Sequence, residues 1–141
     1  MRKQICVIDG QGGGIGVSLI KYIRGVCGES VEITAVGTNA IAATQMMKSG
    51  ANRCASGENA IVRAVAKTDV IIGPIAITWA NAMMGEVTPR IAEAVMSASA
   101  LKILLPLSQE RVIIAGVYKE PLPHLIKSLV GDELREVLNH V

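Results

Sequence analysis

The chain has 141 residues, which is enough for one domain with its own core but leaves no room for a separate substrate domain. Half of the residues are apolar, only 2% are aromatic and the formal net charge is +2. The sequence therefore lacks the basic stripe and the aromatic stacking platform that nucleic-acid binding requires. The apolar runs are too short to span a membrane, and Met1–Gln4 leads directly into an apolar run without a signal peptide. We expect a cytoplasmic protein with neither a nucleic-acid nor a membrane partner.

The mean hydropathy of +0.43 is high. Strands that helices bury on both faces have this character, and a homo-oligomeric contact would be a second explanation. The three cysteines, Cys6, Cys27 and Cys54, are odd in number and lack the spacing of metal ligands. We expect them to be reduced thiols, and no metal site is predicted from them.

Six short apolar runs, each bounded by glycine, proline or polar residues, are predicted strands. They are Gln4–Ile8, Val31–Val36, Ala51–Ala55, Asp69–Gly73, Leu101–Leu107 and Val112–Val117. Helical spacing of apolar residues and capping signals predict helices between and after them. These helices are Gly14–Arg24, Ala40–Lys48, a helix from Ser56 to near Lys67, a short helix within Ile75–Met84, a helix from Pro89 through Val95, and Pro121–Leu138 with a break near Gly131. Thr38, Ser56 and Thr88 are predicted helix caps.

The alternation of strands and helices predicts an α/β fold made of a single Rossmann-like domain that spans residues 1–141. It should be a three-layer, doubly wound sheet whose parallel strands take the order 3-2-1-4-5. The connection Ser108–Glu110 is too short for a crossover helix. We therefore expect Val112–Val117 to return as an antiparallel sixth strand at the edge of the sheet.

A glycine-rich loop follows the first predicted strand and leads into the first helix. Its residues are Asp9, Gly10, Gln11, Gly12, Gly13, Gly14, Ile15 and Gly16. Glycine adopts positive φ angles and lets backbone N–H groups approach a phosphate closely. The N-terminus of the following helix presents its unpaired N–H groups and the positive end of its dipole at the same place. This loop is the predicted binding site for a nucleotide phosphate.

Three further loops should meet the glycine loop where the strand order reverses, between the first and fourth strands. Their candidate ligand-binding residues are Thr38, Asn39, Gly57, Glu58, Asn59 and Pro74. Thr38 and Asn39 stand where an acidic residue usually binds a ribose, and they could hydrogen-bond a ribose or a 2′-phosphate. All of these residues could instead be ordinary turn and cap residues.

Asp9 is unusual because its carboxylate would repel a phosphate. It could accept N–H groups of the loop in an Asx-type turn, which we favour, or hold Mg²⁺ together with a ligand phosphate. Glu58 and Glu86 are candidate general bases, although a solvated glutamate is the more common case. Trp79, Met83 and Met84 could form an apolar lid, or belong to the core or a dimer interface.

The pattern Gly10-x-x-x-Gly14-Ile15-Gly16 resembles that of the short-chain dehydrogenases, which bind nicotinamide cofactors. The chain lacks the Tyr-x-x-x-Lys pair of that family, because Val26 follows Tyr22 at this spacing and Leu122 follows Tyr118. The resemblance therefore points to an NAD(P)-type or other nucleotide cofactor and does not extend to dehydrogenase chemistry. No lysine follows Gly16, so a Walker-type NTPase is not predicted.

Several stretches together resemble a small uncharacterised bacterial family, a domain of unknown function of about this length. These stretches are Asp9–Gly16, Gly37–Ala42, Gly57–Ile61, Asp69–Ile75 and Ile114–Val117. The resemblance implies a free-standing domain and supplies no activity. Three functions remain open: a nucleotide- or dinucleotide-binding domain with a binding or sensing role, a small enzyme that acts on a phosphorylated or carboxylated metabolite through Glu58 or Asp9, and a structural subunit without a ligand.

Overall fold

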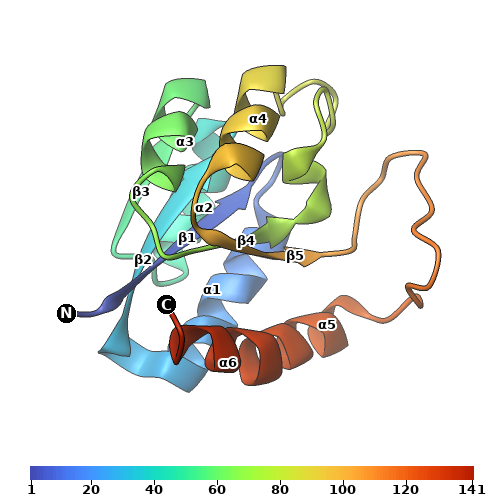
Figure 1. The fold of residues 1–141 in the computed structure, drawn as a ribbon. Coiled ribbons are helices and arrows are strands. Elements are labelled where there is room, and N and C mark those ends of the chain that lie inside the picture. Colours follow the sequence, from blue (N-terminus) through green and yellow to red (C-terminus); the bar gives the residue numbers. More distant parts are fainter.

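The computed structural model describes residues 1–141 and contains one five-stranded parallel sheet (Figure 1). The strand order is β3-β2-β1-β4-β5, which confirms the predicted order 3-2-1-4-5. The strands are β1 (Lys3–Asp9), β2 (Val31–Gly37), β3 (Arg53–Ser56), β4 (Val70–Pro74) and β5 (Leu101–Leu105). The order reverses between β1 and β4, so their carboxyl ends diverge into loops that leave from opposite faces of the sheet.

Helices cover both faces of the sheet and form two separate core clusters. One cluster joins β1, β2 and β4 to α1 (Gly14–Cys27), α2 (Ala40–Lys48) and the C-terminal helices. The other joins the opposite face to α3 (Glu58–Val65), α4 (Pro89–Ser97) and the short 3₁₀ helix η2 (Ile75–Thr78). In Figure 1, α3 and α4 lie above the sheet, and α1, α5 (Leu122–Ser128) and α6 (Arg135–Leu138) lie below it.

The C-terminal helix does not break at Gly131. Helix α5 (Leu122–Ser128) continues through a π-helical segment, Leu129–Leu134, into α6 (Arg135–Leu138). Leu129, Val130 and Leu134 of the π-helical segment are buried against the first core cluster. The wider turn of the π-helix therefore keeps the apolar side chains on both sides of Gly131 facing the sheet.

The core is aliphatic, as a chain without phenylalanine requires. The largest fully buried side chains are aliphatic except for one methionine. They are Ile5, Ile8, Leu19, Ile20, Ile23, Ile33, Met46, Ile61, Ile71, Ile72, Ile77 and Ile91. The five residues of β4 are all buried, which is typical of a strand covered on both faces. The high mean hydropathy is thereby explained by the fold. None of the helices combines the length and the apolar character needed to cross a bilayer.

The predicted sixth strand is absent. Residues 106–121, drawn in orange at the right of Figure 1, form a loop from β5 to α5 with no strand in it. The prediction was wrong because β propensity reflects packing on a half-buried pleated surface. Here the run has no layer to pack against: Ile113 is 96% exposed and Val112 is 49% exposed. These exposed apolar side chains are compatible with a homo-oligomeric contact, which stays a prediction.

Two of the helix-cap predictions are also wrong. The cap of α2 is Asn39, whose side chain accepts a hydrogen bond from the Ala42 N–H at 2.8 Å, and not Thr38. Ser56 does not cap α3 because it belongs to β3, where it pairs with Gly37 of β2, and Gly57 precedes the helix instead. The predicted cap Thr88 is confirmed, since its hydroxyl accepts from the Ile91 N–H at 3.2 Å.

Replacing Thr88 with alanine should lower the free energy of unfolding by about 1 kcal/mol, because the first turn of α4 loses its side-chain acceptor. The same hydroxyl donates to Glu58 at 2.5 Å, which adds to the effect. The matched control is Ser56→Ala, which should change stability by no more than about 0.5 kcal/mol. Urea denaturation of the two variants measures both values, and equal values would contradict the assignment of the caps.

Candidate functional site

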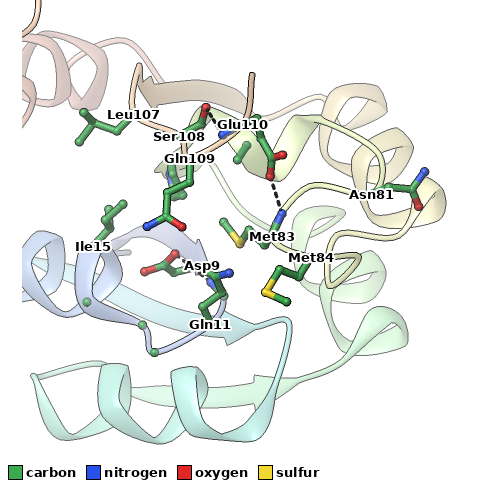
Figure 2. A pocket seen from close by; sticks show the side chains of 16 residues that line it. Asp9, Gln11, Ile15, Asn81, Met83, Met84, Leu107, Ser108, Gln109 and Glu110 are labelled. Carbon is green, nitrogen blue, oxygen red and sulfur yellow. Dashed lines mark hydrogen bonds between the residues drawn. The ribbon is translucent and has the colours of Figure 1, made fainter. Parts of the chain in front are cut away.

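A cavity of about 580 Å³ opens at the carboxyl ends of β1 and β4, where the strand order reverses (Figure 2). Its size falls within the range of about 300–1,000 Å³ that is typical of small-molecule sites. The glycine loop forms one wall through residues 9–15. The last residue of β4 and the segment after it form another wall through Pro74, Ala76, Asn81, Met83 and Met84. The start of the 106–121 loop closes the third side with Leu107, Ser108, Gln109 and Glu110.

Asp9 holds the two ends of the glycine loop together. It is the only buried polar or charged side chain, with 3% of its surface exposed. Its Oδ1 accepts a hydrogen bond from the Gly10 N–H at 2.8 Å and its Oδ2 accepts from the Gly16 N–H at 2.7 Å. The predicted turn role of Asp9 is therefore confirmed.

Burial raises the pKa of Asp9 above its usual value, and the nearby Glu86 acts in the same direction. The N–H donors of Gly16, Gly10 and Ile15 lower the pKa of this carboxyl, although less than burial raises it. No group of three or more potential metal ligands occurs in the structure. Both oxygens of Asp9 are already engaged by the loop, so the contacts favour the turn over a Mg²⁺ site.

Three of the five loop glycines are required by packing. A Cβ atom on Gly10 would lie 2.5 Å from the Thr38 hydroxyl oxygen, and one on Gly16 would overlap the Met46 sulfur. Gly13 has a φ of +78°, and its Cβ would lie 2.9 Å from the Cα of Ala42. These contacts bring the start of α1 close to β2 and α2.

The other two glycines, Gly12 and Gly14, are not required by the fold. A Cβ atom on either one would meet nothing within 4 Å, and neither has a positive φ. Both residues are exposed and line the cavity. Their N–H groups donate to no atom of the chain. The loop thus keeps two backbone donors free at the N-terminus of α1.

Glu86 occupies the position beside Thr38 and Asn39. Its Oε1 accepts hydrogen bonds from the Thr38 hydroxyl at 2.6 Å, the Asn39 side-chain amide at 2.8 Å and the Gln11 N–H at 2.8 Å. Burial alone would raise the pKa of Glu86, but these three donors outweigh it and hold the pKa below the usual value. Thr38 and Asn39 therefore turn toward Glu86 and do not themselves line the cavity.

The loop before α3 does not join the site. Gly57, Glu58 and Asn59 are absent from the cavity wall. The Glu58 carboxylate accepts from Thr88 and lies 3.7 Å from the Arg90 guanidinium, both on the α4 side of the molecule. Of the predicted site residues, the structure therefore brings together Asp9 to Ile15 with Pro74, while Gly16 lies buried behind them.

The wall that follows β5 was not predicted from the sequence. Leu107 to Glu110 were interpreted as a strand end and a hairpin turn, whereas Glu110 reaches across the cavity and its Oε1 accepts the Met83 N–H at 2.8 Å (Figure 2). The position of this loop at the carboxyl end of a strand beside β4 was the signal that could have identified it. Met83 and Met84 line the same cavity, whereas Trp79 lines a second, apolar cavity of about 340 Å³.

The cavity wall contains two acidic side chains and no basic one. Asp9 and Glu110 are its only charged residues, and it contains no lysine, arginine or histidine. Gln11, Asn81, Ser108 and Gln109 supply neutral hydrogen-bonding groups, and Ile15, Met83 and Met84 supply apolar surface. In Figure 2 the Gln109 side chain extends toward Asp9 across the opening. Any anion bound here would depend on backbone donors, since no cationic side chain is present.

Comparison with solved structures gives a similarity to the dodecameric FMN-dependent UbiX-like decarboxylase from Escherichia coli O157:H7. The two share 17% sequence identity with a TM-score of 0.47, over 95% of this chain and 92% of that chain. Comparison with curated proteins finds no match. A family model, described as a domain of unknown function (DUF3842), matches residues 4–138. This match covers nearly the whole chain and agrees with the resemblance found in the sequence, so the protein belongs to the DUF3842 family.

Proposed function

We propose that the protein is a nucleotide- or dinucleotide-binding domain of the NAD(P) type, with a binding or sensing role. The observation that carries this proposal is the presence of glycine at positions 12 and 14, where the folded chain leaves room for a side chain. Packing explains Gly10, Gly13 and Gly16, but it leaves these two glycines unexplained. Close approach of a ligand to the backbone is the remaining reason for a glycine at a cavity wall.

A phosphate would bind at the N–H groups of Gly12 and Gly14. These groups lack acceptors within the chain, and the N-terminus of α1 adds the positive end of its dipole. Four other N–H groups of the loop are already engaged: Gly10 and Gly16 donate to Asp9, Gln11 donates to Glu86 and Gly13 donates to the Gly10 carbonyl oxygen. The phosphate site is therefore small and is formed by the backbone alone.

The rest of the cavity suits the uncharged part of a nucleotide. Met83 and Met84 offer polarizable surface that packs against flat rings. The amide groups of Gln11, Asn81 and Gln109 can donate and accept hydrogen bonds, as the edge of a base requires. Apolar walls with a few polar groups are the usual composition of such sites.

The two alternative functions have less support. A purely structural role for the glycines explains three of the five and leaves Gly12 and Gly14 without a reason. An enzyme that uses Glu58 would need that carboxylate in the cavity, but it lies outside and contacts Thr88 and Arg90. Asp9 is in the cavity wall, yet both of its oxygens accept loop N–H groups. A binding role uses the free backbone donors without requiring either acid.

The double variant Gly12→Ala/Gly14→Ala should lose nucleotide binding while keeping the fold. The wild-type protein is first tested by thermal shift against NAD, NADP, FAD, ATP, S-adenosylmethionine and coenzyme A. A ligand that raises the melting temperature saturably is then titrated calorimetrically into both proteins. The double variant should bind it at least roughly tenfold more weakly, because each added methyl group blocks a backbone donor. Each lost hydrogen bond to a charged group is worth about 1.5–3 kcal/mol.

The matched control is Gly25→Ala, a glycine of the same helix that also has open space around it but lies away from the cavity. It should leave the Kd unchanged and raise stability by about 0.5–1 kcal/mol, as expected for alanine inside a helix. Absence of binding across the whole panel, with no ligand in the purified protein by mass spectrometry, would reject the proposed function in favour of the structural one.

A further inference from the structure

Glu86 presents a fixed carboxylate with one oxygen unused. Three donors from two different loops converge on Oε1: the Thr38 hydroxyl, the Asn39 amide and the Gln11 N–H. No donor of the chain contacts Oε2. The side chain is half-buried and lies just behind the cavity wall, where Oε1 accepts from the N–H of Gln11, which lines the cavity. A carboxylate anchored in this way is a preorganised hydrogen-bond acceptor.

The position of this acceptor is set by the sheet. Thr38 and Asn39 directly follow β2, and Gly10 and Gln11 directly follow β1. Glu86 lies against both, since a Cβ atom on Gly10 would be 3.2 Å from its Oε1. In dinucleotide-binding sheets, the residue after β2 is an acid that accepts the 2′-hydroxyl of a ribose. Here β2 ends without an acid, and a carboxylate from another part of the chain lies at the same point.

The turn that carries Glu86 is strained. Asn81, Met83 and Met84 have φ angles of +69°, +56° and +57°, and Gly85 has +91°. Side-chain-bearing residues in the left-handed region cost free energy and persist where the surrounding structure holds them. The turn is held by the Met83 N–H bond to Glu110 and by the Glu86 carboxylate itself. Strain of this kind concentrates at binding sites.

We propose that Glu86 is the ribose-binding residue of the site and selects nucleotides with a free 2′-hydroxyl over 2′-phosphorylated ones. This inference rests on the nucleotide-binding function proposed above. Oε2 accepts the 2′-hydroxyl, while Thr38 and Asn39 act as positioning residues that hold Oε1. A 2′-phosphate would bring a second negative charge against the carboxylate, which is unfavourable at this distance. The site is thereby assigned to NAD-like rather than NADP-like ligands.

The Glu86→Gln variant tests the role of the charge and of the second oxygen. The amide oxygen can still accept from Thr38, Asn39 and the Gln11 N–H, so the fold should be retained. The amide nitrogen replaces Oε2 and cannot accept a hydroxyl proton. Glu58→Gln is the matched control, because Glu58 also accepts from a threonine hydroxyl but contacts Thr88 and Arg90 of the α4 side and no residue of the glycine loop.

The measurement is the Kd of NAD, 2′-deoxy-NAD, NADP, ATP and 2′-deoxy-ATP for the wild type and both variants. We expect the wild type to bind each 2′-hydroxyl form roughly tenfold more tightly than its 2′-deoxy form, because the deoxy ligand lacks a hydrogen bond to a charged acceptor. Glu86→Gln should reduce this ratio, because its amide nitrogen can only donate to the hydroxyl oxygen without a charge, and it should bind NADP relatively better than the wild type does. Glu58→Gln should leave all ratios unchanged.

Each other outcome identifies what has failed. If NAD or ATP binds and Glu86→Gln keeps the wild-type ratios, Glu86 does not bind the ribose, while the nucleotide-binding function stands. If NADP binds at least as tightly as NAD in a manner dependent on Gly12 and Gly14, the assignment of the ribose site is rejected alone. If nothing in the panel binds, both proposals are rejected together.

Discussion

The Gly13→Ala variant is expected to lose about 2–5 kcal/mol of unfolding free energy, as the sum of two costs. A residue with a Cβ in the left-handed conformation that Gly13 adopts, with φ at +78°, is disfavoured by about 1–2 kcal/mol. The added methyl group would also lie 2.9 Å from the Cα and 3.1 Å from the carbonyl oxygen of Ala42. Because these are backbone atoms, α1 and α2 must move apart, and such overpacking typically costs about 1–3 kcal/mol. Urea denaturation followed by circular dichroism measures the loss.

Gly12→Ala is the control within the same loop, since its new Cβ would meet nothing within 4 Å. It should change stability by less than about 1 kcal/mol. Equal stability of the two variants would mean that the close contact between Gly13 and α2 does not stabilise the fold. The comparison also matters for function: a loss of ligand binding in a Gly13 variant would report on the fold, whereas a loss in a Gly12 variant reports on the cavity.

Much of the fold could be predicted because the signals are local. Buried parallel strands are continuous apolar runs, and those of β1 and β4 are visible directly in the sequence. The alternation with helices and the right-handed crossover rule then fix the strand order. The glycine loop and the turn role of Asp9 were predicted in the same way, because both depend on residues that are neighbours along the chain.

The parts that could not be predicted depend on contacts between distant segments. Val112–Val117 has strand-like residues, but whether it forms a strand depends on a layer to cover it, and none is present. Glu86 lies 48 residues from Thr38 in sequence, so nothing local indicates that its carboxylate takes up the donors of Thr38 and Asn39. The division of the glycines into packed and unpacked ones also follows only from the positions of Thr38, Ala42 and Met46.

The Asp9→Ala variant is expected to lose about 2 kcal/mol of unfolding free energy at neutral pH, because the N–H groups of Gly10 and Gly16 lose their acceptor. Each unsatisfied buried donor costs about 1–3 kcal/mol, and removal of the buried carboxylate offsets part of this sum. Asp9→Asn retains one acceptor oxygen and should be less destabilised than Asp9→Ala. Chemical denaturation at pH 7 ranks the three proteins, and an Asp9→Ala protein as stable as the wild type would show that Asp9 does not organise the loop.

The pH dependence of stability should reveal the buried state of Asp9. Its pKa in the folded protein lies above the unfolded value of about 3.9, so the folded state binds this proton more tightly than the unfolded state does. The part of the stability that comes from protonation of Asp9 is therefore complete below that unfolded pKa and is lost as the pH rises through the raised folded pKa. Asp9→Asn cannot titrate and should lack this loss. As the pH rises from about 4, the unfolding free energy of the wild type should therefore fall relative to that of Asp9→Asn. A difference between the two proteins that stays constant with pH would contradict the raised pKa.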